Sequence, residues 1–252
     1  MSEPPPRIAI IIDDLGHALP AGLRALNLPG PVVCSVLPQT PRGKQIAEAA
    51  HARGKEVLMH QPLQAIDDGD RREQGFISID MNERRLVETL AANLASVPHA
   101  IGVNGHRGSL LTRHPGHMRW LMRALDERGL VFVDSYTTHL SVALRLAKEQ
   151  GIASTRRDVF LDADPHPEAI AREFERLVRL ARNRGSAVAI GHPYPATLAF
   201  LEAELPRLGE RGVELVGLGT LLRRDTLTSA PVAPGRRDAV RARVEPLPAD
   251  SL

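Results

Sequence analysis

Short apolar runs alternate with amphipathic stretches along almost the whole chain. The first run, Ile8–Ile12, is apolar at every position, which is typical of a strand buried on both faces in a parallel sheet. Further runs of strand-like length and composition are Val32–Leu37, Glu56–Met59, Ala100–Val103, Leu130–Val133, Asp158–Leu161, Ala187–Ile190 and Val213–Val216. The pattern therefore predicts about eight buried strands.

The stretches between these runs have the periodicity of helices. We expect helices near Leu19–Leu26 and over Arg42–Ala52, Glu83–Ser96, Pro115–Arg128, Leu140–Glu149, Pro167–Asn183 and Ala196–Glu210. This alternation predicts an α/β protein, a distorted (β/α) barrel of about seven to eight parallel strands in a single domain. An open doubly wound sheet is the alternative, although no glycine-rich dinucleotide motif follows the first strand.

The two ends of the chain differ from the part between them. Residues 1–6 form a Pro-rich leader, residues 7–225 form the predicted barrel domain, and residues 226–252 lack apolar periodicity and are expected to be a mobile tail. The start, MSEPPPR, has no apolar signal core, so no signal peptide is visible. We expect it to follow an upstream signal or anchor. No apolar stretch is long enough to form an integral membrane segment.

Composition narrows the possible partners. The 252 residues are 43% hydrophobic and 25% charged, as in an ordinary globular protein. The net charge of +2 gives no reason to expect nucleic acid as a partner, and aromatic residues, at 3%, offer few stacking surfaces. The single cysteine, Cys34, lies in an apolar run and is expected to be a buried thiol.

Several of the expected strands end in residues that can bind a metal. These residues are Asp13, Asp14, His60, His106, Asp134, Asp162 and His192. In a β/α barrel such strand ends meet at one mouth, and a His/Asp cluster is a typical Zn²⁺ site. Helix capping would explain one of the two adjacent aspartates, but two carboxylates repel unless a cation or a shared proton holds them. The other histidines, His17, His51, His99, His114, His117, His139 and His166, are expected to face solvent.

The order of these motifs resembles the NodB-type polysaccharide deacetylases, and most closely their divergent branch, over about residues 7–223. Asp13 and Asp14 match the aspartate pair that ends the first strand of the family. The stretch Gly54–His60 matches the second motif, although Gln64 stands where that motif has another His. Ile190–His192 matches the last motif. The segment Asn104–Ser109 resembles the corresponding segment of the divergent branch.

The resemblance implies a metal-dependent hydrolase that removes acetyl groups from an N-acetylated carbohydrate polymer. It implies that Asp14, His60 and His106 hold a divalent metal, with Zn²⁺ favoured, and that His106 supplies the nitrogen that Gln64 does not. Asp13 would be the catalytic base, although an exchange of roles between Asp13 and Asp14 stays open. His192 would be the catalytic acid.

The resemblance leaves two further residue roles to be placed. Either Asp134 or Asp162 would hold His192 in the tautomer it needs, and Asn104 and Asp134 are the expected substrate-binding residues. The implied partner is an acetylated glycan in a periplasmic or other extracytoplasmic location. The number of subunits stays open.

A second function from a different class also fits the sequence. The chain could be a weakly active or inactive deacetylase-fold protein that binds carbohydrate or acts as a scaffold in the cell envelope. Gln64 and the scarcity of aromatic residues favour this alternative, whereas Asp13, Asp14 and His192 favour the enzyme. The direction of the Gln64 side chain distinguishes the two.

Two other segments are candidates for function. Ser109 follows His106 closely, but the stretch GHRGS lacks the G-x-S-x-G pattern of a nucleophile elbow. The acidic stretch Ala65–Asp80 lacks the ligand spacing of an EF-hand. We expect this stretch to be a solvated loop beside the site that acts as a substrate lid.

Overall fold

The computed structural model describes residues 4–67 and 73–228, with side chains up to residue 223. Residues 1–3 of the predicted leader and 229–252 of the predicted tail lie outside the described residues, as do residues 68–72 of the predicted lid. The last helix extends to Thr228, beyond residue 225, at which the predicted domain ends.

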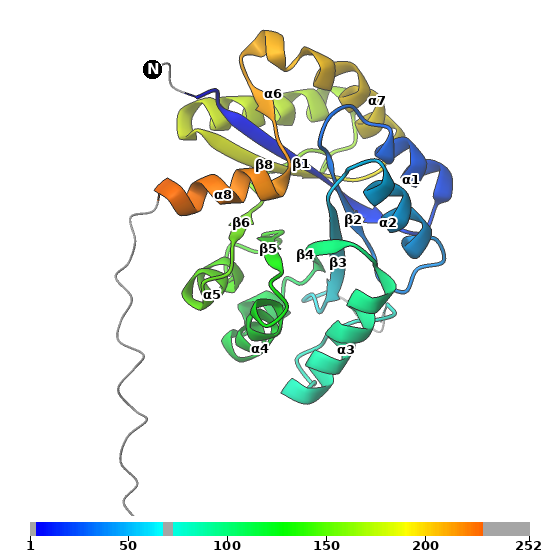
Figure 1. Ribbon diagram of the computed structural model, residues 1–252, viewed down its shortest axis with the longest axis vertical. Helices are drawn as coiled ribbons and strands as arrows, with labels where there is room; N and C mark the ends of the chain where they lie inside the picture. Colours follow the sequence, from blue (N-terminus) through cyan, green and yellow to red (C-terminus); the bar gives the residue numbers. More distant parts are fainter. Residues whose placement is uncertain (1–3, 68–72, 229–252) are drawn as a thin grey trace, which may run out of the picture.

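A parallel sheet forms the centre of the molecule (Figure 1). Its strands are β1 (Arg7–Leu15), β2 (Val33–Val36), β3 (Val57–Leu63), β4 (Ala100–Arg107), β5 (Val131–Asp134), β6 (Ser154–Arg156), β7 (Val159–Phe160), β8 (Ser186–Gly191) and β9 (Glu214–Leu215). They follow the order β6-β5-β4-β3-β2-β1-β8-β7, and β9 pairs with the start of β1. In the described part of the chain, the edge strands β6 and β7 do not pair with each other. The curled sheet is therefore a half-barrel and not a closed barrel. The predicted α/β fold of a distorted barrel is confirmed.

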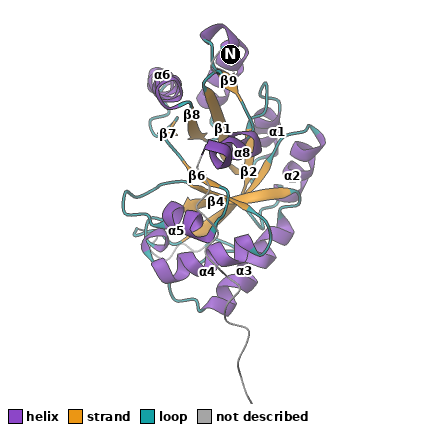
Figure 2. Ribbon diagram, turned by 60° about the vertical axis from the view of Figure 1, so that its left-hand side comes forward, coloured by secondary structure: helices purple, strands orange, loops and turns teal. Residues whose placement is uncertain are grey.

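Helices pack against both sides of this half-barrel, and all of those described except the last, α8, cover its outside (Figure 2). They are α1 (Leu19–Leu26), α2 (Gly43–Ala52), α3 (Glu83–Ser96), α4 (Pro115–Asp126), α5 (Ala143–Gln150), α6 (Pro167–Arg184), α7 (Pro195–Glu204) and α8 (Leu218–Thr228). Helix α7 ends before the predicted Glu210. Its successor is a short 3₁₀ turn, Leu205–Arg207, because Pro206 has no N–H to continue an α-helix.

The predicted strand Asp158–Leu161 is wrong in its extent. The structure has two short strands there, β6 and β7, separated by Arg157 and Asp158. Strand β6 pairs with β5 and strand β7 pairs with β8, so this segment supplies both open edges of the sheet. The break places Arg157 at the gap of the half-barrel.

The sheet separates two apolar cores. The larger lies between the sheet and the outer helices, and the smaller lines the inner face of the curve. Helix α8 was not expected from the sequence; Leu218, Leu221 and Leu222 pack it against the inner core, and Figure 2 shows it inside the curved sheet. Glu56 fixes its start, because its carboxylate accepts hydrogen bonds from the backbone N–H groups of Leu218 and Gly219 at 2.5 and 3.0 Å.

Cys34 and most of the remaining histidines have the burial that the sequence predicts. Cys34 is buried and free, as predicted. Five of the seven histidines expected to face solvent are exposed, but His114 and His117 are partly buried. Nε2 of His117 lies 3.0 Å from the carbonyl oxygen of Met81, which accounts for its inward position. Among the described residues no helix is both long and apolar enough to cross a membrane.

Candidate metal centre

A bulge at the end of β1 presents both aspartates to the same site. Ile12 pairs with Cys34 and Leu15 with Val36, so β1 has one more residue than β2 in this interval. Asp14 occupies the left-handed region with φ of 57°, which aspartate adopts more readily than most residues. A regular strand would send the two side chains to opposite faces. Here Asp13 Oδ2 and Asp14 Oδ1 lie 3.6 and 3.3 Å from Nε2 of His60.

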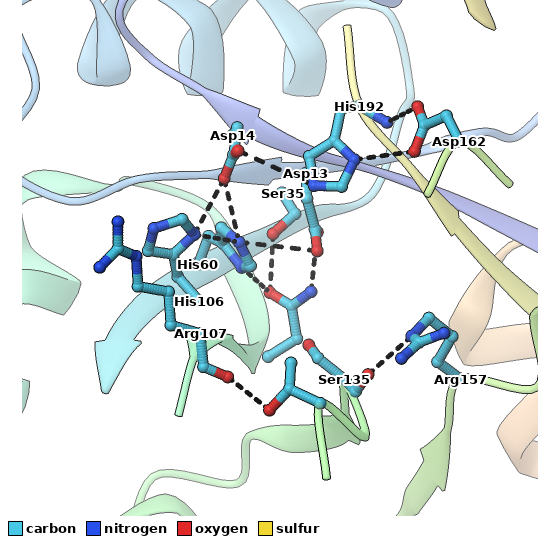
Figure 3. Close-up of polar contacts among 12 residues, drawn as sticks. Asp13, Asp14, Ser35, His60, His106, Arg107, Ser135, Arg157, Asp162 and His192 are labelled. Carbon is cyan, nitrogen blue, oxygen red and sulfur yellow. Dashed lines mark hydrogen bonds and ion pairs between the residues drawn. The ribbon is translucent and has the colours of Figure 1, made fainter. Parts of the chain in front are cut away.

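The side chains of Asp14, His60 and His106, from β1, β3 and β4, converge at this point (Figure 3). Nδ1 of His106 lies 3.0 Å from Oδ1 of Asp14 and 3.1 Å from Nε2 of His60. His60 is buried, and Asp14 and His106 are partly buried. The structure therefore brings together the three residues that the family resemblance implies as metal ligands.

His60 is held in one tautomer by Asn104. The amide nitrogen of Asn104 donates to Oδ1 of Asp13 at 2.8 Å, because a carboxylate can only accept. Its amide oxygen then faces Nδ1 of His60 at 2.9 Å and also accepts from the hydroxyl of Ser35 at 2.7 Å. Nδ1 of His60 must carry the proton, which leaves the lone pair on Nε2 directed at Asp14 and His106.

His106 is held in the complementary tautomer by Glu73. Nε2 of His106 lies 3.3 Å from a carboxylate oxygen of Glu73, so this nitrogen is the donor. The lone pair of His106 therefore belongs to Nδ1, the atom beside Nε2 of His60. Glu73 was not predicted as a site residue. The acidic character of its stretch was visible in the sequence, but its partner in β4 was not.

The donor set fits a divalent metal ion. Oδ1 of Asp14 is buried and makes no hydrogen bond, and it faces two imidazole nitrogens whose lone pairs point at the same region. Three converging lone pairs repel unless a proton or a cation lies among them. One carboxylate and two imidazoles with an open side suit Zn²⁺ and several other divalent ions.

The charges of this cluster are strongly coupled. Burial raises the pKa of Asp14, but the imidazole groups of His106 and His60 close to its carboxylate outweigh burial and hold this pKa well below its usual range. Burial lowers the pKa of His60, but the charges of Asp13 and Asp14 outweigh burial and raise it to about 9. Without a metal, His60 therefore binds a second proton at neutral pH, and this proton takes the lone pair of Nε2 that a metal would otherwise use.

His192 faces the cluster from β8. Its Nε2 lies 3.8 Å from Oδ2 of Asp14, and its Nδ1 donates to Oδ1 of Asp162 at 2.9 Å. Asp162 is itself fixed by the hydroxyl of Thr197 and the backbone N–H of His192. Burial lowers the pKa of His192, but the hydrogen bond and charge of Asp162 outweigh it, so the pKa is raised. Of the two candidates for this partner, the structure selects Asp162 over Asp134.

The structure does not support the two predicted substrate-binding residues. Asn104 is fully buried and its amide orients His60 and Asp13. Asp134 is buried too, and its carboxylate accepts from the backbone N–H of Tyr136 and the hydroxyl of Ser141. The polar side-chain atoms of both residues are therefore engaged within the protein.

Gln64 and Ser109 both point to other partners. The side-chain oxygen of Gln64 accepts from the backbone N–H of Ile79 at 2.9 Å, so Gln64 is turned away from the cluster. The hydroxyl of Ser109 accepts from the backbone N–H of Ile66 at 3.0 Å. His106, and not Gln64, therefore lies in the cluster with Asp14 and His60, and the Ser109 hydroxyl is engaged with the backbone.

Comparisons with known proteins agree with this fold and define the class of protein. The parallel half-barrel is similar in fold to the catalytic domain of a peptidoglycan N-acetylglucosamine deacetylase from Eubacterium rectale, with a TM-score of 0.55 and 17% identity. That match covers 86% of this chain and 90% of the other. A family model described as divergent polysaccharide deacetylase matches residues 10–222. The chain belongs to the divergent polysaccharide deacetylase family.

Two further similar proteins are described as uncharacterized. An uncharacterized protein of Haemophilus influenzae is 36% identical over 219 residues, which is 87% of this chain and 78% of that protein. The crystal structure of an uncharacterized protein from Agrobacterium tumefaciens C58 has a TM-score of 0.83 and 23% identity, covering 88% of this chain and 91% of the other. These likenesses support the family and the fold.

Proposed function

We propose that this chain is a metal-dependent hydrolase that removes acetyl groups from an N-acetylated glycan. The main support is that two groups of polar side chains, the metal-ligand cluster and a histidine–aspartate pair, face each other across one mouth. Asp14, His60 and His106 turn their lone pairs to one point, and the His192–Asp162 pair approaches the same carboxylate at 3.8 Å. A scaffold would need neither unit, because both cost free energy in buried polar groups.

A divalent metal held by Asp14, His60 and His106 would polarise the acetyl carbonyl and lower the pKa of a water molecule. Asp13, buried beside the ligand nitrogen of His60, would accept the proton of the attacking water. His192 would donate its proton to the amine as the C–N bond breaks, and the acetyl carbon would leave bonded to the water oxygen as acetate. Asp162 keeps Nδ1 of His192 protonated, so the donor is Nε2.

An aromatic face beside this mouth supports a sugar as the substrate. The ring of Tyr194 stacks on that of His192 with centroids 5.4 Å apart and an angle of 26° between planes. Tyr194 is 45% exposed, and it lies in the loop that follows β8. An exposed aromatic ring next to the catalytic acid is suited to packing against a pyranose ring. Tyr194 was not singled out in the sequence, although its position just after His192 pointed to the mouth.

Release of acetate from an N-acetylglucosamine tetramer tests the proposal. Zinc-loaded protein should release acetate, and the activity should be lost on chelation and return with added Zn²⁺. Asp13→Asn and His192→Ala should keep the metal and lose the activity. His166→Ala is a matched control, because His166 is exposed and pairs only locally with Asp164. Metal binding without hydrolysis of any acetylated glycan would instead support the carbohydrate-binding or scaffold role.

A further inference from the structure

A cavity of about 300 Å³ adjoins the His192 side of the mouth. Phe160 forms part of its lining, and the ring of Phe160 lies 5.3 Å from that of His192 between centroids. Helix α6 supplies Arg172 and Arg176 to the lining, and Arg157 comes from the gap between β6 and β7. The proposed reaction uses none of these three arginines.

The charges lining this cavity are not balanced. Three guanidinium groups face two carboxylates, those of Asp164 and Glu173. Glu173 is engaged by Arg176 at 3.0 Å, and Asp164 is engaged by His166 at 2.6 Å. Among the described side chains, none makes a hydrogen bond or ion pair with Arg172. Arg157 and Arg172 therefore bring positive charge to the cavity without a carboxylate paired to either.

The guanidinium group of Arg157 is held in place by two neutral backbone carbonyl groups. Its Nε and Nη2 donate to the carbonyl oxygens of Ser135 and Tyr136 at 2.7 and 2.9 Å. Its guanidinium carbon lies 4.8 Å from the centroid of the Phe160 ring. Burial lowers the pKa of Arg157, and the charge of Arg176 lowers it further against the opposing effects of Asp13 and Asp134. Two like charges are thus held near one another beside the mouth.

We propose that this cavity binds an acidic group, a carboxylate or a phosphate, on the same glycan whose acetyl group reaches the metal centre. The inference rests on the proposed deacetylase function and narrows its substrate to an acidic glycan. Guanidinium groups bind carboxylates and phosphates through paired N–H donors. The cavity lies one aromatic ring away from His192, so the acidic group would belong to the acetylated sugar or its neighbour.

Calorimetric binding of three matched probes tests this proposal. The probes are a neutral N-acetylglucosamine tetramer, a tetrasaccharide alternating N-acetylglucosamine with N-acetylmuramic acid, and an N-acetylglucosamine tetramer bearing a 6-phosphate. Zinc-loaded Asp13→Asn protein serves throughout, so that no probe is consumed. We expect at least one acidic probe to bind about tenfold more tightly than the neutral one, as a charge-assisted contact predicts. The acidic probe that binds more tightly shows whether the cavity prefers the carboxylate or the phosphate.

Two helix variants separate the cavity from general surface charge. Adding Arg172→Gln should abolish the preference for the acidic probe and leave the neutral probe unchanged. Arg179→Gln is the control, because Arg179 lies on the same helix and does not line this cavity. A preference that survives Arg172→Gln, or equal binding of all three probes, would overturn this inference alone. Failure of every probe to bind would contradict the proposed function as well.

Discussion

At the scale of single residues, Asn104 controls the ligand cluster. Its amide links Ser35, His60 and Asp13, so its orientation fixes the tautomer of His60. Asn104→Ala should lower zinc affinity about 10- to 100-fold, as is typical for residues that orient a metal ligand. Competition with a chromophoric chelator measures this change.

A matched asparagine elsewhere provides the control for that variant. Asn82 caps α3 by accepting from the backbone N–H of Arg85 at 3.0 Å. Asn82→Ala should cost about 1 kcal/mol of unfolding free energy, the usual value of a helix cap, and leave zinc affinity unchanged. Equal zinc affinity in the Asn104→Ala and Asn82→Ala proteins would show that Asn104 does not orient the ligands.

The raised pKa of His60 predicts how metal binding depends on pH. With a pKa of about 9, His60 carries a proton in the metal-free protein at neutral pH, and a metal must displace it. Zinc affinity should therefore rise about tenfold per pH unit between pH 6 and 8, and binding should release protons. Calorimetry in buffers of different ionisation enthalpy counts them. An affinity that is flat over this range would contradict a protonated His60.

The sequence identifies the chemistry of the site but not its supporting contacts. His60, His106 and His192 follow apolar runs, so the barrel topology alone predicts that they approach one another. The contact between Glu73 and His106 spans 33 residues and depends on where a loop folds back. The same limitation hid the contacts of Asn104, because its neighbours in β2 and β1 are distant in the sequence.

At the scale of elements, the bulge in β1 is the feature that makes two adjacent aspartates useful. Residues Ile8–Ile12 pair regularly with β8, and the irregularity begins where the polar residues begin. The sequence shows the charged pair but not the extra residue in the register. A strand without the bulge would place one carboxylate in the site and the other on the opposite face.

The Glu56 carboxylate links β3 to the start of α8. We expect Glu56→Ala to lower the free energy of unfolding by about 1–3 kcal/mol, since two backbone N–H groups lose a charged acceptor. Urea denaturation of the metal-free protein measures this loss. Glu202→Ala is the control, because Glu202 makes an exposed pair with Arg24. Equal stability of the two variants would show that Glu56 does not anchor α8.

The role of Glu56 was not visible in the sequence. Glu56 belongs to the Gly54–His60 motif, but its partner is the N-terminus of α8, a helix that the sequence pattern did not predict. That helix is signalled by Leu218, Leu221 and Leu222, which have the spacing of one helical face. It was not predicted because it runs into residues 226–252, which lack apolar periodicity.

At the scale of the whole molecule, the half-barrel leaves an edge free on each side of Arg157. Helix α8 fills the inner face that a closed barrel would fill with strand side chains, so the apolar core is complete without closure. The mouth carries the metal cluster on β1, β3 and β4 and the acid on β8. The sequence predicts this architecture because alternating buried strands and helices have few other stable arrangements.

Cys34 is fully buried in the larger core, so its thiol should be unreactive in the folded protein. Burial raises the pKa of Cys34 to about 12, although Lys55 opposes this, so the reactive thiolate is disfavoured near neutral pH. Because Cys34 is the sole cysteine in the sequence, a thiol reagent reports on it alone. Ellman's reagent at pH 8 should not react until the protein is unfolded. Rapid reaction with the native protein would contradict this packing.

The metal content of the purified protein tests the central claim most directly. After dialysis against Zn²⁺ and removal of excess, wild-type protein should retain about one zinc per chain, the occupancy of a single three-ligand site. His60→Ala/His106→Ala should retain none. The control His51→Ala/His99→Ala removes two stacked surface histidines and should bind as the wild type does. Zinc retained in full by the His60→Ala/His106→Ala protein, or absent from the wild type, would contradict the account.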